Sequence, residues 1–335
     1  MGKMAILMIL GLSFAVGIYT YIITQRSVEA TDNYSAYYAY TNARNIAHSA
    51  VNIALREIEL HNDSPYEGTF GLGKFRVDTS NVGDSVSMES RSWYMDTSYV
   101  MYLLLQKYAK PFPEVESAVA LNVEDVDFEV NGSGEIDGRD HDMDGNFIGP
   151  GLPGVTVPSG SESTTVVNEA TPPASIIGTP VKVRSSDDMP DPSQYVDEYI
   201  LNADYSYNPG TYSSITWGSA DDPVVVYCNG TPSQVKFTGN VQGWGVLVVR
   251  GKIWIGGNFV FRGLVIVYGD SEVARDTLAT GAGTPDILGA VVMAGAPGSK
   301  FEMKGNPKFA YSSDALGNAR DMVKLRAYKV IRWWE

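Results

Sequence analysis

The sequence predicts a mainly β fold with a long N-terminal α-helix, which carries a head built as a parallel β-helix, or solenoid. Three observations predict this class. An uncharged apolar run opens the chain, two glycine-bounded motifs recur in phase in its second half, and glycine supplies 34 of the 335 residues. Glycine is a poor helix former, so this content excludes a mainly helical protein.

Composition and charge exclude several classes of function. The chain is 44% hydrophobic and long enough for a packed core in one to three domains. Lys and Arg number 25 against 39 Asp and Glu, a net charge of −14 without a basic cluster. This charge repels phosphate backbones, so we expect no nucleic-acid partner. The single cysteine, Cys228, excludes an intrachain disulfide framework and a multi-thiolate metal site.

The first element is an apolar helix. Residues 4–23 carry no charge, and a bilayer core of about 30 Å needs about 20 such residues. Lys3 before the run and Arg26 after it favour, weakly, an orientation with the N-terminus inside. A cleaved secretory signal fits poorly, because the run is long and no small-x-small site follows Ile23. Lipid or a helical bundle would bury the apolar side chains of this assembly helix, which include Ile6, Ile9, Leu12, Val16, Ile18 and Ile22.

The helical pattern continues beyond the apolar run. No Pro or Gly occurs from residue 18 to residue 63, so residues 4–60 form one rod of about 85 Å at 1.5 Å per residue. One stripe faces a globular body: Ala39, Ala43, Ile46, Ala47, Ala50, Ile53, Ala54 and Ile58. Tyrosines gather where the two halves meet, as an interfacial belt or as a packing surface between subunits: Tyr19, Tyr21, Tyr34, Tyr37, Tyr38 and Tyr40.

A rod that is half apolar and half amphipathic, followed by a β-rich body, resembles type IV pilin-like proteins. The segment 40–55 has the pattern A-x-x-I-A-x-S-A from Ala43 to Ala50, which resembles the PilX-like pilus-assembly branch with its β-helical head. Leu7 stands at the fifth position after Gly2, where pilins usually carry Glu. The resemblance implies a helix held in the inner membrane before assembly and in the filament core afterwards. It implies as partners further copies of the chain, in a helical homopolymer, and a secretion and assembly machinery.

The head is predicted from two repeated motifs. The pattern apolar-x-apolar-x-Gly-Asn ends at Asn240, Asn258 and Asn306. A glycine, four apolar residues, any residue and a second glycine occupy residues 245–251, 263–269 and 289–295. Gly239 and Gly257 are 18 residues apart, and so are Gly245 and Gly263. The first motif indicates strands with one wet face and the second indicates strands covered on both faces, as on successive sides of a coil. An antiparallel sandwich is the alternative.

We expect three segments: a helix over residues 1–61, a β-rich connection over 62–125, and the solenoid head over 126–335 with a Pro/Gly-rich exposed insertion near 149–179. The smaller elements are predicted as follows: strands at 69–79, 85–94, 126–130 and 223–228, a strand or helix at 99–108, a short helix at 191–202, a loop at 270–285 and a docked tail at 320–335.

One loop has the spacing of a calcium ligand set. Asp140, Asp142 and Asp144 alternate before Gly145, which is the D-x-D-x-D-G core of EF-hand-like loops, and Asn146 would offer its carbonyl oxygen. The bidentate Glu of the twelfth position is absent, so Glu135, Asp137 or water would complete a weak Ca²⁺ site. His141 would point away from the ion. The alternative is an Asx-turn loop without metal. Similar segments in PilX-like heads are in line with the resemblance.

No catalytic motif is present, so we expect no enzyme. The function that we predict is a structural subunit of an extracellular pilus-like filament, anchored in the membrane before assembly, with the β head exposed on the cell surface. A minor pilin or tip adhesin is one alternative. A membrane-anchored carbohydrate-active β-helix enzyme is the other, and its candidate residues are Asp221, Asp222, Lys236, Lys252 and Arg262.

Overall fold

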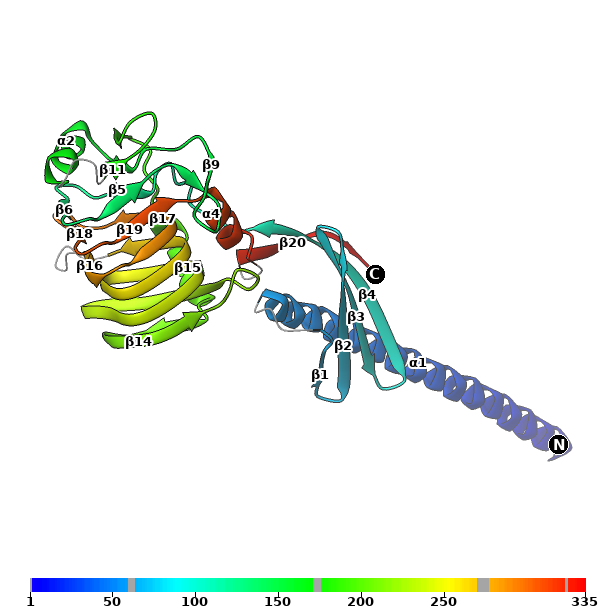
Figure 1. Ribbon diagram of the computed structural model, residues 1–335. Helices are drawn as coiled ribbons and strands as arrows, with labels where there is room; N and C mark the ends of the chain where they lie inside the picture. Colours follow the sequence, from blue (N-terminus) through cyan, green and yellow to red (C-terminus); the bar gives the residue numbers. More distant parts are fainter. Residues whose placement is uncertain (1, 60–63, 171–175, 270–276, 323–324) are drawn as a thin grey trace. The chain divides into compact units, whose positions relative to one another are not determined.

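The computed structural model describes residues 2–59, 64–170, 176–269, 277–322 and 325–335 (Figure 1). The chain divides into two compact units. We call residues 1–108 and 327–335 the stalk unit, and residues 109–326 the head unit. The predicted fold class, mainly β with a long N-terminal helix, is confirmed.

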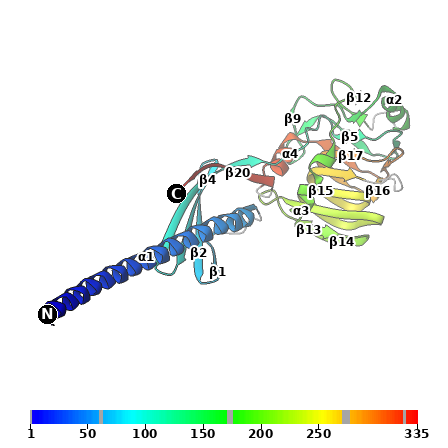
Figure 2. The ribbon, with the colours of Figure 1, turned by 180° about the vertical axis from the view of Figure 1, so that it is seen from behind.

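Helix α1, Gly2–Glu59, is the rod of the stalk unit (Figure 2). It runs without a break through the part of the predicted rod that is described; Leu60 lies outside the described residues. The predicted stripe is buried from Ala39 onward with one exception. Ile53 is exposed, and Val51, four residues after Ala47, is buried in its place. The buried face is therefore rotated slightly from the predicted one.

A five-stranded sheet packs on the second half of α1. Its order is β1-β2-β3-β4-β20, and its pairs from β1 to β4 are antiparallel. The strands are β1 Tyr66–Phe70, β2 Gly73–Val82, β3 Ser85–Tyr94, β4 Thr97–Ala109 and β20 Arg326–Trp334. The prediction of one strand over 69–79 was wrong, because Gly71 turns the chain with a φ of 57°. The strand over 85–94 is confirmed, and the ambiguous segment 99–108 is a strand.

The sheet meets α1 through alternate residues. Met88, Met101 and Leu103 are buried in one cluster with the alanines of the helix. The side-chain hydroxyl of Ser92 donates a 2.6 Å hydrogen bond to the carbonyl of Ala43, and Ser90 donates one of 3.1 Å to Ala47. Alanine side chains are small enough to let a strand approach the helix backbone this closely. The second half of α1 is therefore held both by apolar packing and by direct hydrogen bonds.

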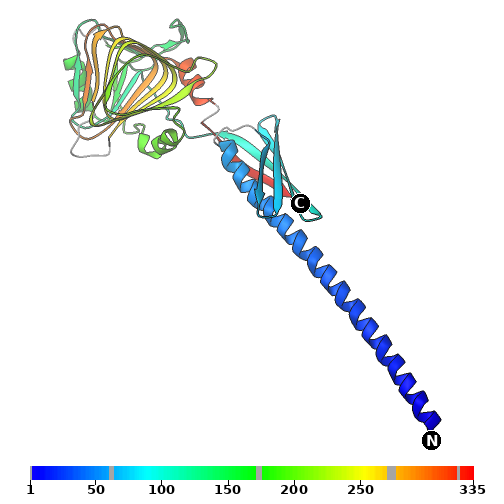
Figure 3. The same cartoon turned by 90° about the horizontal axis from the view of Figure 1, so that it is seen from below.

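The head unit is a curled parallel sheet, seen along its winding in Figure 3. Its longest strand, β15 Val224–Tyr268, winds over several sides of the coil. A methyl group on Gly263 would meet the carbonyl oxygen of Gly245 at 2.0 Å, and one on Gly257 would meet the backbone of Gly239 at 2.6 Å. Residues 18 apart thus lie directly against one another, as the repeat predicts. Gly263 also pairs in parallel register with Gly289. The antiparallel sandwich is excluded, because all the described ladders of this sheet are parallel.

The other elements of the head unit complete this sheet and cover it. Its further strands are β5 Val119–Asn122, β6 Asp127–Val130, β7 Glu135–Asp137, β10 Val155–Val157, β11 Ile176–Ile177, β12 Val183–Ser185, β13 Tyr205–Tyr207, β14 Gly210–Trp217, β16 Thr277–Gly283, β17 Asp286–Ala294, β18 Lys300–Met303 and β19 Lys308–Tyr311. A hairpin, β8 Asp140–His141 and β9 Phe147–Gly149, stands apart. The helices are α2 Gly160–Glu169, the 3₁₀ turn η2 Pro192–Gln194, α3 Val196–Leu201 and α4 Ser313–Arg320.

Two hydrophobic cores lie on the two faces of the glycine-bounded strands. Val265 and Val291 are fully buried inside the coil. Val248 and Ile266 are buried on the other face, under α3, α4 and the segment that follows β4. The prediction that these strands are covered on both faces is therefore confirmed. The first motif has one wet face, since Trp254 is only half-buried between two buried isoleucines.

The structure differs from the predicted segments at several boundaries. The parallel sheet begins with β5, before residue 126, and the tail leaves the head to pair with β4. The segment 149–179 is not simply an exposed insertion: β10 pairs with β5 and β12, and Val155 and Val157 are fully buried. Part of the loop predicted at 270–285 is strand β16, which pairs with β15; residues 270–276 lie outside the described residues. For β10 the physical reason is burial, because Val155 and Val157 enter the core by joining the sheet.

Candidate assembly surface and acidic loop

The first half of α1 is an apolar surface without a cover. The six residues predicted for assembly, Ile6, Ile9, Leu12, Val16, Ile18 and Ile22, are between 43% and 70% exposed. The helix is long and apolar enough to cross a membrane, by length and composition, and its most apolar window is not buried at all. Burying one large aliphatic side chain is worth about 1.5–3 kcal/mol. Leaving these apolar side chains in water is therefore unfavourable.

The tyrosines at the junction fall into two groups. The ring of Tyr38 lies edge-on to that of Tyr94 with 6.0 Å between centroids, and Tyr40 meets Tyr99 in the same way at 5.5 Å. These two tyrosines belong to the contact between α1 and the sheet. Tyr34 and Tyr37 are exposed, so they remain available to an interface with lipid or with another subunit.

The C-terminal segment is fixed to α1 and to β4 by charge and ring contacts. A side-chain nitrogen of Arg44 lies 2.8 Å from Oε1 of Glu335. The ring of His48 lies 5.0 Å from that of Trp333, and Trp334 stacks on Tyr102 at 6.0 Å. The hydrogen bond from Arg44 lowers the pKa of Glu335 to about 2. The tail therefore docks, as predicted, and it docks within the stalk unit.

The acidic loop lies on the hairpin formed by β8 and β9. The two carboxylate oxygens of Asp140 accept hydrogen bonds of 2.8 Å from the amide and the hydroxyl of Ser313, the first residue of α4. Asp142 accepts from the amides of Asp144 and Asn146, and from the side-chain amide of Asn146 at 2.9 Å. Gly145 turns the chain with a φ of 87°. Hydrogen bonds from Asn146 hold the pKa of Asp142 below its usual range.

The predicted calcium ligands are thus close in the chain but engaged in different tasks. Asp140 accepts hydrogen bonds from the first residue of α4 and Asp142 closes an Asx turn, which is the arrangement expected of the loop without metal. Within the described ranges no group of three His, Cys, Asp or Glu side chains is placed to hold a metal ion. The residues do not form a three-carboxylate cluster as they stand, so calcium binding by Asp140, Asp142, Asp144 and Asn146 stays a prediction.

An ion pair between a buried carboxylate and a partly exposed arginine supports the same hairpin. Asp137 is fully buried and lies 2.7 Å from a guanidinium nitrogen of Arg139. Burial raises the pKa of Asp137, but the hydrogen bonds from Arg139 outweigh it, and the net direction is downward. His141 is also buried; its Nδ1 lies 3.0 Å from the carbonyl oxygen of Tyr311, and its Nε2 lies 3.7 Å from Asp137. His141 therefore ties the hairpin to β19.

The candidate residues for a carbohydrate-active enzyme do not form one described cluster. Arg262 pairs with Asp286 at 2.8 Å. The ammonium of Lys236 lies 4.1 Å from the centre of the Trp254 ring. The amide of Asp222 bonds to Ser219 in a turn. The charged groups of Arg262 and Lys236 thus have structural partners on the sheet, and Asp222 takes part in a turn through its backbone.

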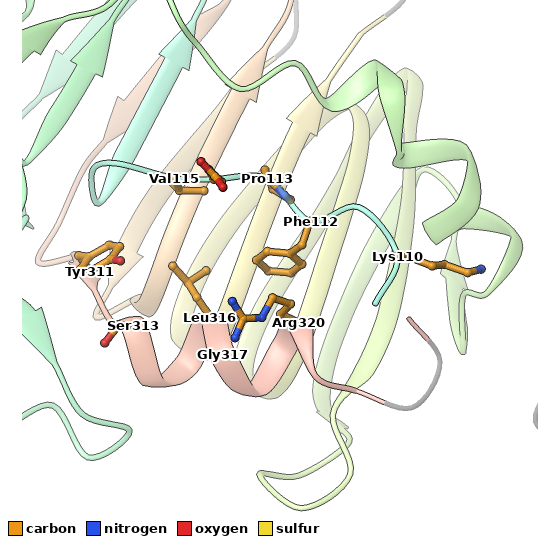
Figure 4. A pocket seen from close by; sticks show the side chains of 10 residues that line it. Lys110, Phe112, Pro113, Val115, Tyr311, Ser313, Leu316, Gly317 and Arg320 are labelled. Atoms are coloured by element: carbon orange, nitrogen blue, oxygen red, sulfur yellow. The ribbon is translucent and has the colours of Figure 1, made fainter. Parts of the chain in front are cut away.

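Sequence analysis missed two cavities in the head unit. They lie over the hydrophobic core that contains Val248 and Ile266. The larger, of about 520 Å³, lies between α4 and the segment after β4 (Figure 4). Phe112, Leu316 and Arg320 line it, whereas the side chain of Lys110 points away. The smaller, of about 320 Å³, lies between residues 111–116 and 188–195. Neither segment has a motif; only their proline, aromatic and acidic composition could have drawn attention to them.

The geometry defines a chain with a mainly β head and a long helix whose first half is apolar and exposed. The sequence matches no known family profile and no curated protein. Among solved structures, the crystal structure of the competence-associated pilin ComZ from Thermus thermophilus is similar at 11% identity, with a TM-score of 0.28, over 81% of this chain and 86% of that chain. A TM-score of this size carries no argument about fold or function.

Proposed function

We propose that this protein is a structural subunit of an extracellular pilus-like filament. The single observation that carries the proposal is the contrast along α1. Its first half is apolar and exposed, whereas its second half is locked to the stalk sheet by packing and by the serine hydrogen bonds. A rigid rod with one bare apolar end is suited to a bundle of like rods, and such a bundle would carry the heads on its outside.

The same helix supports an earlier membrane-bound stage. The apolar residues of its first half would lie in lipid before assembly and against neighbouring helices afterwards, so the six assembly residues serve in both environments. On this proposal the protein is anchored in the inner membrane, passed to an assembly machinery, and then incorporated with other copies into a homopolymer. It acts by assembly rather than by catalysis.

Electron microscopy of material sheared from expressing cells tests the proposal. The native chain is expected to form filaments. Val16→Asp should abolish them, because a charge in lipid or between helices costs several kcal/mol. The matched variant Val16→Leu keeps the surface apolar and should form filaments normally. Isolated particles from the native chain, or filaments from Val16→Asp, would contradict the role given to the helix.

A further inference from the structure

The smaller cavity of the head unit is acidic and aromatic. Its lining includes four carboxylates, Glu114, Glu116, Asp188 and Asp191, together with Phe112 and Tyr195. Glu114 and Glu116 come from the segment after β4, whereas the aspartates come from the segment that leads into η2. The fold thus brings like charges from two distant segments to the walls of one cavity.

Most of this negative charge is not balanced within the head. Glu116 pairs with Arg184 at 2.8 Å. In the part of the chain that the structure describes, Glu114, Asp188 and Asp191 form no ion pair with a basic side chain. Three carboxylates around a cavity of about 320 Å³ favour a cation inside it. The described residues offer no three-ligand metal group here, so the cation that fits is an ammonium or guanidinium group.

Tyr195 adds an aromatic wall to the cavity. Its side chain lines the cavity and is only 7% exposed, yet its hydroxyl has no hydrogen-bond partner among the described residues. Burial, and after it the charge of Asp191, raise the pKa of this hydroxyl. The rings of Phe112 and Tyr195, which line the cavity, favour a cation inside it.

The chain itself carries a surface of the opposite charge. Strand β20 has three basic residues in nine, in a protein of net charge −14. Lys329 and Arg332 are exposed and make no ion pair with a described residue. Val330, Ile331, Trp333 and Trp334 are exposed beside them. This strand is also an edge of the stalk sheet. It therefore presents cationic side chains beside exposed tryptophans, and Trp and Arg are residue types that are enriched at protein interfaces.

We propose that the acidic cavity of one copy receives a basic side chain from β20 of a second copy, Lys329 or Arg332. The inference rests on the proposed function and adds to it a specific contact between subunits. The two surfaces differ, so the contact is head-to-tail. Contacts of that type, repeated from copy to copy, build open polymers rather than closed dimers.

Cross-linking between differently tagged copies tests the contact. Cys228 is the only cysteine and is fully buried, so introduced thiols can be addressed alone. One full-length chain carries Met189→Cys in the cavity wall, and the other carries Val330→Cys on β20. A short bismaleimide should link the two introduced cysteines and so give a product that carries both tags, in filaments and in detergent extracts of the membrane. The control chain with Leu201→Cys, an exposed position on α3, should not cross-link with Val330→Cys.

Charge reversal then identifies the groups. Asp188→Lys, or Lys329→Glu with Arg332→Glu, should each lower the yield of cross-link at least about fivefold, as expected when a close ion pair at an interface is lost. Combining Asp188→Lys with the two reversals on the partner chain should restore the yield. A restored yield would mean that the two charges pair directly, because the losses of yield from two unrelated defects would add.

The outcomes separate this inference from the proposed function. Filaments without the cross-link would overturn the contact and leave the filament subunit standing. A cross-link in detergent extracts of cells that form no filaments would support the contact and contradict the filament. Binding of spermine by the full chain, without a cross-link above the Leu201→Cys control, would assign the cavity to a soluble amine and overturn the docking of β20.

Discussion

The side-chain amide of Asn258 donates a 3.2 Å hydrogen bond to the side-chain oxygen of Asn240, one 18-residue repeat earlier in the chain. Thr284 extends the row, since its hydroxyl donates at 3.0 Å to the side-chain oxygen of Asn258. These residues occupy one corner of the coil in successive windings. The recurrent Gly-Asn of the first motif thus has two roles: glycine permits the sharp corner, and asparagine bonds to the winding beside it.

Val265→Asp should unfold the head unit. Val265 is fully buried inside the coil and pairs with Val291 of the next winding. An unpaired charge at such a position costs about 3–5 kcal/mol. Lys252→Ala, on the half-exposed face of the same strand, should cost little. Thermal unfolding of the full chain in detergent, followed by circular dichroism, measures both. A native-like transition for Val265→Asp would contradict the assignment of this core.

Gly263→Ala should destabilise the coil, whereas Gly317→Ala should not. Gly263 has a φ of 135°, and an added methyl group would lie 2.0 Å from the carbonyl oxygen of Gly245. A non-glycine residue in such a conformation costs about 1–3 kcal/mol before any clash is counted. Gly317 lies in α4 with open space around its added methyl group, and alanine there gains up to about 1 kcal/mol of helix propensity. The melting temperatures should move in opposite directions; equal losses would refute the stacking of the windings.

Stability at low pH should depend on Glu302. Burial raises its pKa, but hydrogen bonds from Lys304 and Lys300 outweigh it and lower the pKa from 4.5 to about 2. Because the folded-state pKa is lowered, the ionised group contributes stability that is complete above about pH 4.5 and is lost as the pH falls toward about 2. Glu302→Gln should therefore flatten the fall in unfolding free energy over that window. Glu169→Gln, at an exposed position of α2, should leave the fall unchanged.

Calcium should stabilise the head if the acidic loop binds it. The carboxylates of Asp140 and Asp142 are held by hydrogen bonds, and an ion would have to recruit their free lone pairs together with Asp144. A site without the bidentate Glu is expected to bind in the range of about 10⁻⁴–10⁻³ M. The melting temperature should then rise with calcium. Asp142→Asn with Asp144→Asn should abolish the rise. Identical melting with calcium and with chelator would reduce the motif to an acidic turn.

The sequence was most informative where one short-range rule decides the structure. The absence of Pro and Gly after residue 18 predicted the rod. The 18-residue glycine spacing predicted which windings meet. A corner with a positive φ and a close approach of two backbones both require glycine. The strand over 85–94 was also predicted, and in the structure its more buried and less buried side chains alternate.

The features that were missed depend on contacts between distant segments. Nothing local in residues 326–334 shows that this strand returns to β4. Val155 and Val157 lie in a Pro/Gly-rich stretch that reads as a loop, and only pairing with β5 makes them core. The spacing of the acidic residues predicted a bound ion. In the structure Asp140 instead accepts hydrogen bonds from Ser313, which is more than 170 residues away in the chain. The acidic cavity joins two segments that carry no motif.

The return of the chain to β20 has a mechanical consequence. The head unit is an insertion between two neighbouring strands of the stalk sheet, and the amide of Lys110 donates a 2.7 Å hydrogen bond to the carbonyl of Leu325 where the two connections leave the head. A pull on the head is therefore shared by two covalent strands instead of one. The load enters the stalk along β4 and β20 together, so it acts on the length of a hydrogen-bonded ladder and not on a single strand end.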